Sequence, residues 1–565
     1  MKKNTFLLLI ILIIAAFLRF YQLGQNPPSL TWDEAAWGYN AYLLGIDGKD
    51  EFGRFLPLDY LESFGDFKPP VYAYLDIIPV KIFGLNEFAV RFPSAFLGVL
   101  TVLLTYFLTK RIFSENPKSE IRNPKQIQNT KYKILNTELI ALLSAFILAI
   151  SPWHIMLSRA AFEANVATFF IVAGVVLFLS SVQGKKWLLL LSAVSFLISL
   201  YTFNTARIVS PLLLLVLAIG FRRELFKIKK QVVVAIIIGI LLLLPSINFF
   251  MSSKASLRFK EVNIFSNIGV IIDTNQEIAN DSNAIWSKIL HNRRFAYGVS
   301  YLKHYFDNLS PSFLFIKGDG NPKFSTQAVG EMYLWDLVFF TAGIFILLRK
   351  REGSWWIVPV WLILGIIPAG TARETPHALR IEASLPTFQI FTAIGVTTFL
   401  YWIKNLGIKK YFKFSIIFVI FLILFFNFLY FYHDYTKHYS KEFSREWQYG
   451  YKDSIDYVAR NYNNYDEIRV MTVLGRPYIY YLFYAKYNPS RFKQTAVVNR
   501  DANGFVSVLA YDKYRFMEKM DISNKTRSKI LYISTPDNIP KKSIKLKTFY
   551  ILNGESVLIA FTRKI

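Results

Sequence analysis

Two carboxylates stand side by side shortly after the first apolar run of the chain. Asp33 and Glu34 belong to the stretch TWDEAAWGYN, and six further acidic residues follow before residue 68. Neighbours on a helix point about 100° apart, so one of this pair can face a site while the other faces a loop, a metal or a second ligand. A solvated loop that happens to be acidic explains the same stretch. These residues alone leave both interpretations open.

Further polar side chains collect in loops, whereas the long apolar runs are almost uncharged. These residues are Asp66 and Lys68, Arg159 and Glu163, Arg207, and Glu374, His377 and Arg380. We expect their loops to meet on one face of a membrane. A proton-coupled transporter more often places acids at mid-depth. A site at the outer membrane interface suits a substrate with a lipid tail and a polar head.

Residue types and patterns that other chemistries need are missing. The chain has no cysteine, which excludes disulfides, thiolate nucleophiles and cysteine metal sites. Its six histidines lack the HExxH or HxxxH spacing of a zinc site. No P-loop or GxGxxG pattern occurs, so we do not expect a nucleotide-driven machine.

Length and composition predict a polytopic α-helical membrane protein. The 565 residues are 53% hydrophobic, and several apolar runs approach the roughly 20 residues that cross a bilayer. The net charge of +26 lies mainly in short loops between these runs, as the positive-inside rule requires, so it does not indicate a nucleic-acid partner. About eleven spans are expected, at residues 6–18, 92–108, 139–157, 164–181, 187–203, 208–220, 232–250, 333–348, 355–369, 385–403 and 414–431.

Loop charge predicts the topology of these spans. Lys2 and Lys3 precede the first run, which we interpret as an uncleaved anchor with a cytoplasmic N-terminus. Basic loops such as residues 110–133 then fall on the cytoplasmic side, and acidic or histidine-bearing loops fall outside. The membrane domain is expected at residues 1–432. Its outer loops are residues 24–91, 251–331 and 371–380.

Two further segments have a predicted structure of their own. Residues 71–83 are apolar but contain charges and a proline, so we expect an interfacial helix. Residues 433–565 predict an extracytoplasmic α/β domain that covers or feeds the site, although they contain no catalytic motif. Its expected elements are a helix at residues 447–461 and strands at residues 467–473, 505–511, 529–534, 544–551 and 557–562.

Three stretches together resemble a known group of membrane enzymes. They are Asp33-Glu34, Lys68-Pro69-Pro70 and GLNEFAVRFPSAFLGVLTVLL, which begins at Gly84. The combination is similar to the GT-C membrane glycosyltransferases, especially the dolichyl-phosphate-mannose–protein mannosyltransferases and the bacterial aminoarabinose transferases. The resemblance covers roughly the first 210 residues, continues more weakly to about residue 400, and does not reach the tail.

The resemblance implies a GT-C fold, a sugar donor carried on a polyprenyl phosphate, and a reaction at the outer face of the plasma membrane. It places Asp33 at the catalytic acidic position and Lys68 at a lysine that contacts the lipid phosphate in the aminoarabinose transferases. In those enzymes a glutamate that helps to bind a metal precedes this lysine. Here Phe67 takes that place, with Asp66 one residue earlier. A divalent metal is therefore left open, and its candidate ligands are Asp33, Glu34 and Asp66.

The implied reaction is a displacement at the anomeric carbon of the sugar. An inverting enzyme needs one base to take the acceptor hydroxyl proton, and Asp33 with Glu34 beside it forms the predicted catalytic pair. The leaving group is already a phosphate, so it needs cations more than a general acid. Arginine can hold it through a bidentate fork. The candidate substrate-binding residues are Asp66, Lys68, Arg159, Glu163, Arg207, His377 and Arg380.

These residues also have structural interpretations. Asp33 can cap a helix, and Lys68 can extend to lipid head groups. Arg159 and Arg207 can pair with Glu163 or cap the ends of spans. His377 can satisfy a loop carbonyl, and Glu34 can support Asp33 or a metal.

The sequence therefore predicts an inverting glycosyltransferase with membrane lipid as a further partner and a protein, lipid or glycan acceptor. The alternative function is a flippase, an exporter or a non-catalytic binder of lipid-linked glycans. Formation of a new glycosidic bond distinguishes the enzyme from all three.

Overall fold

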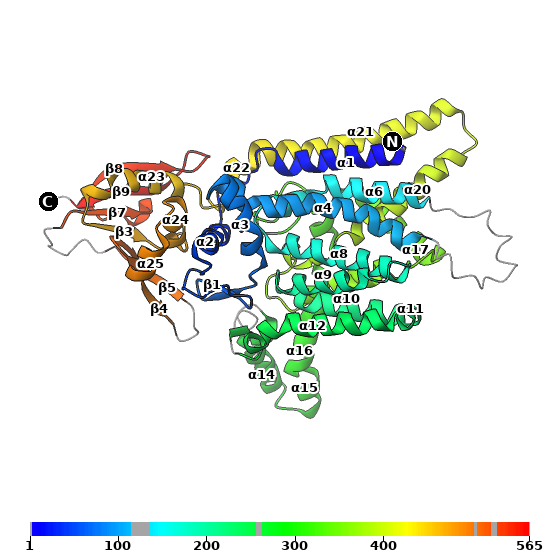
Figure 1. Ribbon diagram of the computed structural model, residues 1–565, viewed down its shortest axis with the longest axis horizontal. Helices are drawn as coiled ribbons and strands as arrows, with labels where there is room; N and C mark the ends of the chain where they lie inside the picture. Colours follow the sequence, from blue (N-terminus) through cyan, green and yellow to red (C-terminus); the bar gives the residue numbers. More distant parts are fainter. Residues whose placement is uncertain are drawn as a thin grey trace. The chain divides into compact units, whose positions relative to one another are not determined.

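The computed structural model describes residues 3–114, 136–252, 254–255, 263–501, 506–520 and 528–563 (Figure 1). The chain divides into two compact units. Unit 1 comprises Met1–Arg19, Phe96–Ser158 and Glu163–Tyr432, and unit 2 comprises Phe20–Ala95, Arg159–Phe162 and His433–Ile565. The acidic N-terminal segment and the C-terminal tail thus belong to the same unit. Most of the predicted basic loop at residues 110–133 lies outside the described residues.

Every predicted span falls on a helix, because a long apolar run must satisfy its backbone groups internally. These helices are α1 (Lys3–Phe20), α4 (Glu87–Phe113), α6 (Thr137–Ile150), α7 (Pro152–Arg159), α8 (Glu163–Val182), α9 (Leu188–Leu200), α10 (Ala206–Gly220), α12 (Lys229–Phe250), α17 (Asp336–Lys350), α18 (Ile357–Gly370), α20 (Thr387–Asn405) and α21 (Lys410–His433). The chain is a polytopic α-helical membrane protein with a sheet-containing C-terminal part.

The number of spans depends on how bent helices are counted. Among the described residues, five helices are long and apolar enough to cross a membrane alone: α1, α4, α8, α12 and the continuous Lys410–Glu442. Two bent pairs raise this number to seven. They are α6 with α7, bent by 56°, and Ala378–Ser384 with α20, bent by 63°. The remaining apolar helices are shorter, so a total of eleven spans stays a prediction.

Helices α17 and α20 of unit 1 approach each other closely through two glycines. Gly343 of α17 lies against the Phe391 carbonyl of α20, and Gly395 of α20 lies against the Phe339 carbonyl of α17. A Cβ at either glycine would overlap with that carbonyl oxygen. Small residues allow this approach of helix backbones in membranes, where dispersion and hydrogen bonds drive packing.

The predicted outer loop at residues 251–331 contains helices. They are α14 (Ile268–Asn280), α15 (Ile285–Leu290) and α16 (Arg293–Asp307), followed by the π-helix η3 (Ser312–Lys317). Tyr301 and Tyr305 of α16 donate hydrogen bonds to the carbonyls of Ile367 and Ile363 in α18, at 3.4 and 2.9 Å. Part of this segment therefore runs alongside an apolar helix.

Unit 2 is built on a seven-stranded sheet with the order β4-β5-β6-β3-β7-β9-β8. Its central strand β3 is parallel to β6 and β7, and the other pairs are antiparallel. The strands are β3 (Glu467–Met471), β4 (Val497–Arg500), β5 (Val506–Tyr511), β6 (Tyr514–Met517), β7 (Ile530–Ser534), β8 (Ser543–Tyr550) and β9 (Ser556–Arg563). Each predicted strand corresponds to an observed strand whose ends are shifted by a few residues. The first residue of one prediction, residue 505, lies outside the described residues. Strands β4 and β6 were not predicted.

Three helices accompany this sheet, and one of them packs on the N-terminal segment (Figure 1). The predicted helix at residues 447–461 is α23 (Tyr451–Asn461), which begins after Gly450, and α25 (Pro489–Thr495) was not predicted. Helix α24 (Pro477–Tyr484) was not predicted either, and its run of aromatic residues is equally typical of a strand. Residues 477–483 are all buried, as expected for a helix that is apolar on every side. Helix α24 packs against α2 (Trp32–Asp47), and α2 also packs against α3 (Val71–Phe83).

Candidate active site

Helix α2 begins at a capping box that fixes the positions of the acidic pair. The Thr31 hydroxyl accepts a hydrogen bond from the Glu34 backbone N–H at 3.2 Å, and the Thr31 N–H donates to the Glu34 carboxylate at 2.9 Å. The sequence T-x-x-E is the pattern that forms this reciprocal cap. Asp33 therefore lies in the first turn of α2, where the helix dipole favours a negative charge.

Glu34 is fully buried and surrounded by donors. One carboxylate oxygen accepts from the Nε of Arg91 at 2.9 Å and from the backbone N–H of Ala161 at 3.0 Å. Arg91, also fully buried, donates further hydrogen bonds to the carbonyls of Leu23 and Pro27. Glu34 thus joins the start of α2 to the segment that precedes it and to residue 161.

Asp33 contacts Lys68, the lysine of the Lys-Pro-Pro sequence. The Asp33 carboxylate and the Lys68 ammonium form an ion pair in which 50% of the Asp33 side chain but only 7% of the Lys68 side chain is exposed. The Lys68 Nζ also lies 5.1 Å from the ring centre of Trp37 and 5.2 Å from that of Phe64. Aromatic faces attract a cation in such positions. The pair presents one accessible carboxylate beside one enclosed cation.

A short hairpin positions Lys68. Strands β1 (Leu61–Ser63) and β2 (Asp66–Lys68) pair antiparallel, with Lys68 opposite Leu61. Lys68 is the last residue of β2, and Pro69 and Pro70 separate it from α3. Asp66 and Lys68 are two residues apart on β2, so their side chains start from the same face of the strand.

The predicted metal ligands are not arranged around a common point. Among the residues that the structure describes, no three histidine, aspartate or glutamate side chains form a group that fits a metal ion. Glu34 accepts from Arg91, Ala161 and Thr31, and Asp33 is paired with Lys68. These contacts engage both oxygens of Glu34 and one oxygen of Asp33, and we derive no step through a metal.

Arg159 lies in unit 2 and binds two segments of it. Its guanidinium donates to the carbonyl of Asn26 at 2.7 Å and to the hydroxyl of Tyr435 at 3.2 Å. The Asn26 side chain in turn donates to the carbonyl of Tyr435 at 2.8 Å. Only 3% of Arg159 is exposed, so its contacts hold the chain before α2 against the start of the tail.

A second buried carboxylate, Glu51, was not singled out from the sequence. Its carboxylate accepts from the Tyr478 hydroxyl at 2.7 Å and from the Ser63 hydroxyl at 3.2 Å, and its N–H donates to the Asn40 side chain at 3.0 Å. Burial raises the pKa of Glu51 to about 7, although the two hydroxyl hydrogen bonds oppose this rise. Glu51 therefore connects α2, β1 and α24.

His377 lies in unit 1 at the start of the short helix α19 (Ala378–Ile381). Its N–H donates to the side chain of Asn308 at 2.9 Å, and its ring lies 4.9 Å from that of Phe324. Burial, assisted by the positive charge of Arg380, lowers the pKa of His377 to about 3. The imidazole is therefore neutral at pH 7 and brings no positive charge to a phosphate.

Asp319, an acid that the sequence interpretation missed, lies next to His377, and a second missed acid, Glu331, binds Asp319. The Asp319 carboxylate accepts from the Ala378 N–H at 2.7 Å and lies 3.7 Å from the His377 Nδ1. Burial raises the pKa of Asp319 to about 6 and that of Glu331 well above its usual range. The Asp319 N–H donates to the Glu331 carboxylate at 2.9 Å. Their position in the loop before the predicted span at residues 333–348 is the sequence feature that could have identified them.

The remaining predicted site residues also belong to unit 1. Arg207 donates to the Leu200 carbonyl at 3.3 Å, and its guanidinium lies 5.6 and 5.1 Å from the rings of Phe249 and Phe250. This geometry fits a structural role in which Arg207 caps the end of α9. Glu163 is the first residue of α8.

The structure therefore distributes the predicted site over the two units. Unit 2 contains Asp33, Glu34, Asp66, Lys68 and Arg159, and unit 1 contains Glu163, Arg207, His377 and Arg380. Within unit 2, Asp33 and Lys68 are in contact, while Glu34 and Arg159 bind the backbone around them.

Two solved structures have a similar arrangement of elements. ArnT from Cupriavidus metallidurans in the apo state has a TM-score of 0.51 at 12% identity, with 98% of this chain and 97% of that chain covered. The oligosaccharyltransferase of Archaeoglobus fulgidus in the apo form has a TM-score of 0.51 at 15% identity, with 86% of this chain and 64% of that chain covered. Both are GT-C proteins.

The chain has the GT-C fold. At sequence identities of 12% and 15%, the similarity to these two structures concerns the fold alone. The N-terminal part of the GT-C chain also matches a sequence family, at residues 9–116, described as dolichyl-phosphate-mannose-protein mannosyltransferase. The matched residues include Asp33, Glu34, Lys68 and Arg91.

A relative among curated proteins shares part of this GT-C chain. It is an uncharacterised protein of Aquifex aeolicus (strain VF5), 31% identical over 226 residues, which are 39% of each protein. The chain thus matches well under half the length of this relative, and about two thirds of the archaeal oligosaccharyltransferase.

Proposed function

We propose that the chain is an inverting glycosyltransferase that moves a hexose or pentose from a polyprenyl-phosphate donor to an acceptor. The observation that carries this proposal is the Asp33–Lys68 pair, an accessible carboxylate beside an enclosed cation at a helix N-terminus. The name of the matching family includes dolichyl phosphate, and the archaeal oligosaccharyltransferase AglB has been solved with a dolichol-phosphate and an inhibitory peptide. Both names support a lipid-phosphate donor.

The two residues take complementary roles in a single displacement. The acceptor hydroxyl oxygen attacks the anomeric carbon from the face opposite the phosphate, and the bond from that carbon to the phosphate oxygen breaks. Asp33 accepts the hydroxyl proton. The electron pair of the broken bond leaves with the polyprenyl phosphate, whose charge Lys68 offsets. Attack from the opposite face inverts the configuration of the sugar.

The other residues of unit 2 position this pair. Glu34 and Arg159 hold the backbone before α2, and Asp66 begins the strand that ends at Lys68. Arg380, which belongs to unit 1, stays a candidate for binding a phosphate. Its guanidinium lies close enough to His377 to lower the pKa of that imidazole.

We place the reaction at the outer face of the plasma membrane. The loops at residues 24–91, 251–331 and 371–380 are acidic or bear histidine, whereas the basic loops alternate with them along the chain. Residues 1–432 are then the membrane domain with a cytoplasmic N-terminus, and residues 433–565 are extracytoplasmic. Reporter fusions after Asn461 and after Lys125, which lies outside the described residues, should report opposite sides of the membrane.

Purified protein mixed with a panel of polyprenyl-phosphate sugars and candidate protein, lipid and glycan acceptors tests the activity. Mass spectrometry should find an acceptor heavier by one sugar, and Asp33→Asn should lose this product while retaining donor binding. Movement of the donor between leaflets without any new glycosidic bond would instead establish a flippase.

A further inference from the structure

Helix α16 has an apolar stripe that no part of the described chain covers. Phe295, Val299, Leu302 and Phe306 are 61%, 51%, 55% and 61% exposed. Their spacing of four, three and four residues places all of them on one side of the helix. Large apolar patches on a protein surface normally mark an interaction site.

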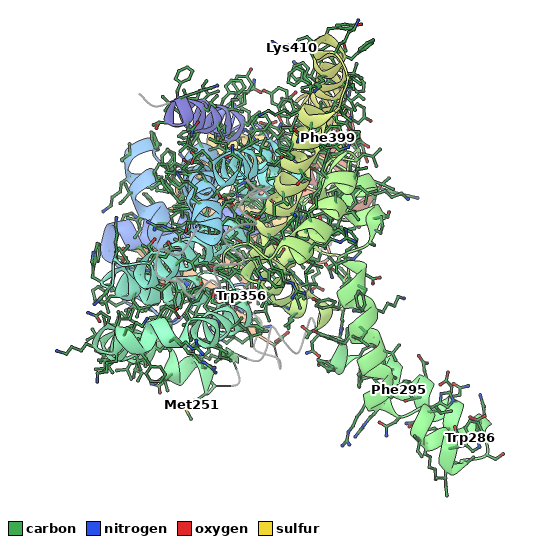
Figure 2. All side chains as sticks on the ribbon, turned by 90° about the vertical axis from the view of Figure 1, so that its right-hand side faces the viewer. Met251, Trp286, Phe295, Trp356, Phe399 and Lys410 are labelled. Atoms are coloured by element: carbon green, nitrogen blue, oxygen red, sulfur yellow. The ribbon has the colours of Figure 1, made fainter. Side chains whose placement is uncertain are left out.

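The apolar surface continues onto the neighbouring helix. Ile285, Trp286, Ile289 and Leu290 of α15 are all exposed, Ile285 by 80%. We call residues 264–307 the arm. Phe295 and Trp286 lie on the part of the arm that extends away from the other helices of unit 1 (Figure 2).

Other side chains of α16 fix the arm to the rest of unit 1. Tyr301 and Tyr305 of α16 bind carbonyls of α18, and the His304 ring bonds the Ala372 carbonyl at 2.7 Å. At the base of the arm, the Ile264 N–H donates to the Thr371 carbonyl at 2.9 Å. The exposed stripe of α16 is therefore held beside a helix of the membrane domain, whose Ile363 is itself 55% exposed.

Polar residues border the apolar surface. Arg293 and Arg294 begin α16, and Lys288 lies on α15 two residues after Trp286, about 160° around the helix from it. Helices that lie in the membrane interface combine basic residues on one face with tryptophan, phenylalanine and leucine on the other. This composition favours lipid over a protein partner.

We propose that the arm is a membrane-docking element whose apolar face enters the lipid bilayer. The arm lies flat in the interface, with Phe295, Val299, Leu302 and Phe306 among acyl chains and Arg293 facing the head groups and water. The apolar surface of the membrane domain then continues along the arm. The inference does not depend on the chemistry of the Asp33 site.

Docking of the arm would act on the loop that carries His377. Asp307, the last residue of α16, accepts a hydrogen bond from the Thr375 hydroxyl at 3.0 Å. Asn308 follows and accepts from the His377 N–H at 2.9 Å. Two direct hydrogen bonds thus connect the end of α16 to residues 375–377, so a shift of α16 on lipid binding would move this loop.

The absence of cysteine permits a test without background labelling. The full chain is prepared as Phe295→Cys and as the control Arg293→Cys, which lies on the same helix about 160° around its axis. Both are labelled with an environment-sensitive fluorophore and reconstituted in phosphatidylcholine–phosphatidylglycerol vesicles. Emission from position 295 should shift to the blue and be quenched by nitroxide lipids, whereas position 293 should be quenched by aqueous iodide.

Two outcomes would overturn the proposal. Quenching of position 295 by iodide but not by nitroxide lipids means that the stripe faces water. Protection of position 295 from both quenchers means that protein covers the stripe, and cross-linking between copies would identify a dimer interface. Ile285→Cys provides an independent second position, on α15, and should behave as position 295 does.

Discussion

The Nε of Arg91 lies 2.9 Å from the Glu34 carboxylate, and neither side chain reaches solvent. The neighbouring carboxylate, Asp33, is half exposed and paired with Lys68. Two adjacent acids of similar chemistry therefore have different partners and different access to a substrate. We assign positioning to Glu34 and proton transfer to Asp33.

Replacing Arg91 with methionine should destabilise the protein severely. The substitution leaves the buried Glu34 carboxylate without its cation, and breaking one partner of a buried pair typically costs about 3–5 kcal/mol. Thermal unfolding in detergent measures this loss. Replacing the exposed Arg445 with methionine should have almost no effect, because surface ion pairs contribute little. An unchanged melting temperature for Arg91→Met would show that the pair is dispensable.

Replacing Lys68 with alanine should weaken donor binding about 10- to 100-fold, the loss expected for one hydrogen bond to a charged group. Lys68→Arg should retain more affinity, because it keeps the positive charge. Binding of a fluorescent polyprenyl phosphate measures both variants, and Lys81→Ala, an exposed lysine on α3, is the matched control. Equal and negligible effects of both Lys68 substitutions would mean that this lysine does not contact the phosphate.

Glu51 should make stability depend on pH. Burial raises its pKa from 4.5 to about 7, so between these values the unfolded chain releases this proton while the folded protein keeps it. Protonated Glu51 therefore contributes fully to the free energy of unfolding below pH 4.5. This contribution is lost as the pH rises to about 7, which lowers the free energy of unfolding by at most roughly 3 kcal/mol. As the pH rises from 4.5 to about 7, the melting temperature of Glu51→Gln should therefore fall less steeply than that of the parent protein. The exposed Asp47→Asn should leave the slope as in the parent protein, and an identical slope in Glu51→Gln would refute the assignment.

Removing residues 433–565 should abolish donor binding as well as transfer. The tail belongs to the unit that contains the Asp33 site, and its Tyr478 and Tyr480 bind Glu51 and the Leu30 carbonyl on either side of α2. Phe483 packs so closely against Gly38 that no side chain fits there. Donor binding and circular dichroism of the truncated chain are the measurements. Normal donor binding by that chain would show that the tail serves only the acceptor.

The sequence was most informative where local patterns determine structure. Long apolar runs predicted every helix that corresponds to a proposed span, and the divergence of adjacent helical residues anticipated that Asp33 and Glu34 face different surroundings. The contacts that define their roles could not be predicted. Arg91 is 57 residues from Glu34, and Tyr478 is 427 residues from Glu51. No periodicity relates such distant positions.

Helix α24 of the tail had no counterpart among the predicted elements. The run PYIYYLFY has aromatic residues typical of a strand, yet it forms α24 because Pro477 suits a first helical turn and both sides of the helix are buried. The prediction of a separate domain at residues 433–565 rested instead on the polar character of the tail and its strand pattern. Its grouping with the segment around α2 appears only when the chain is folded.

The central claim is that Asp33 is the general base, and the transfer rate of Asp33→Asn tests it most directly. The amide keeps the size and the hydrogen bonding of the side chain but removes the basic oxygen. Single-turnover transfer from a matched polyprenyl-phosphate donor should slow at least about a hundredfold, while donor affinity and melting temperature stay close to those of the parent protein. Transfer by Asp33→Asn at nearly the parental rate would contradict the account.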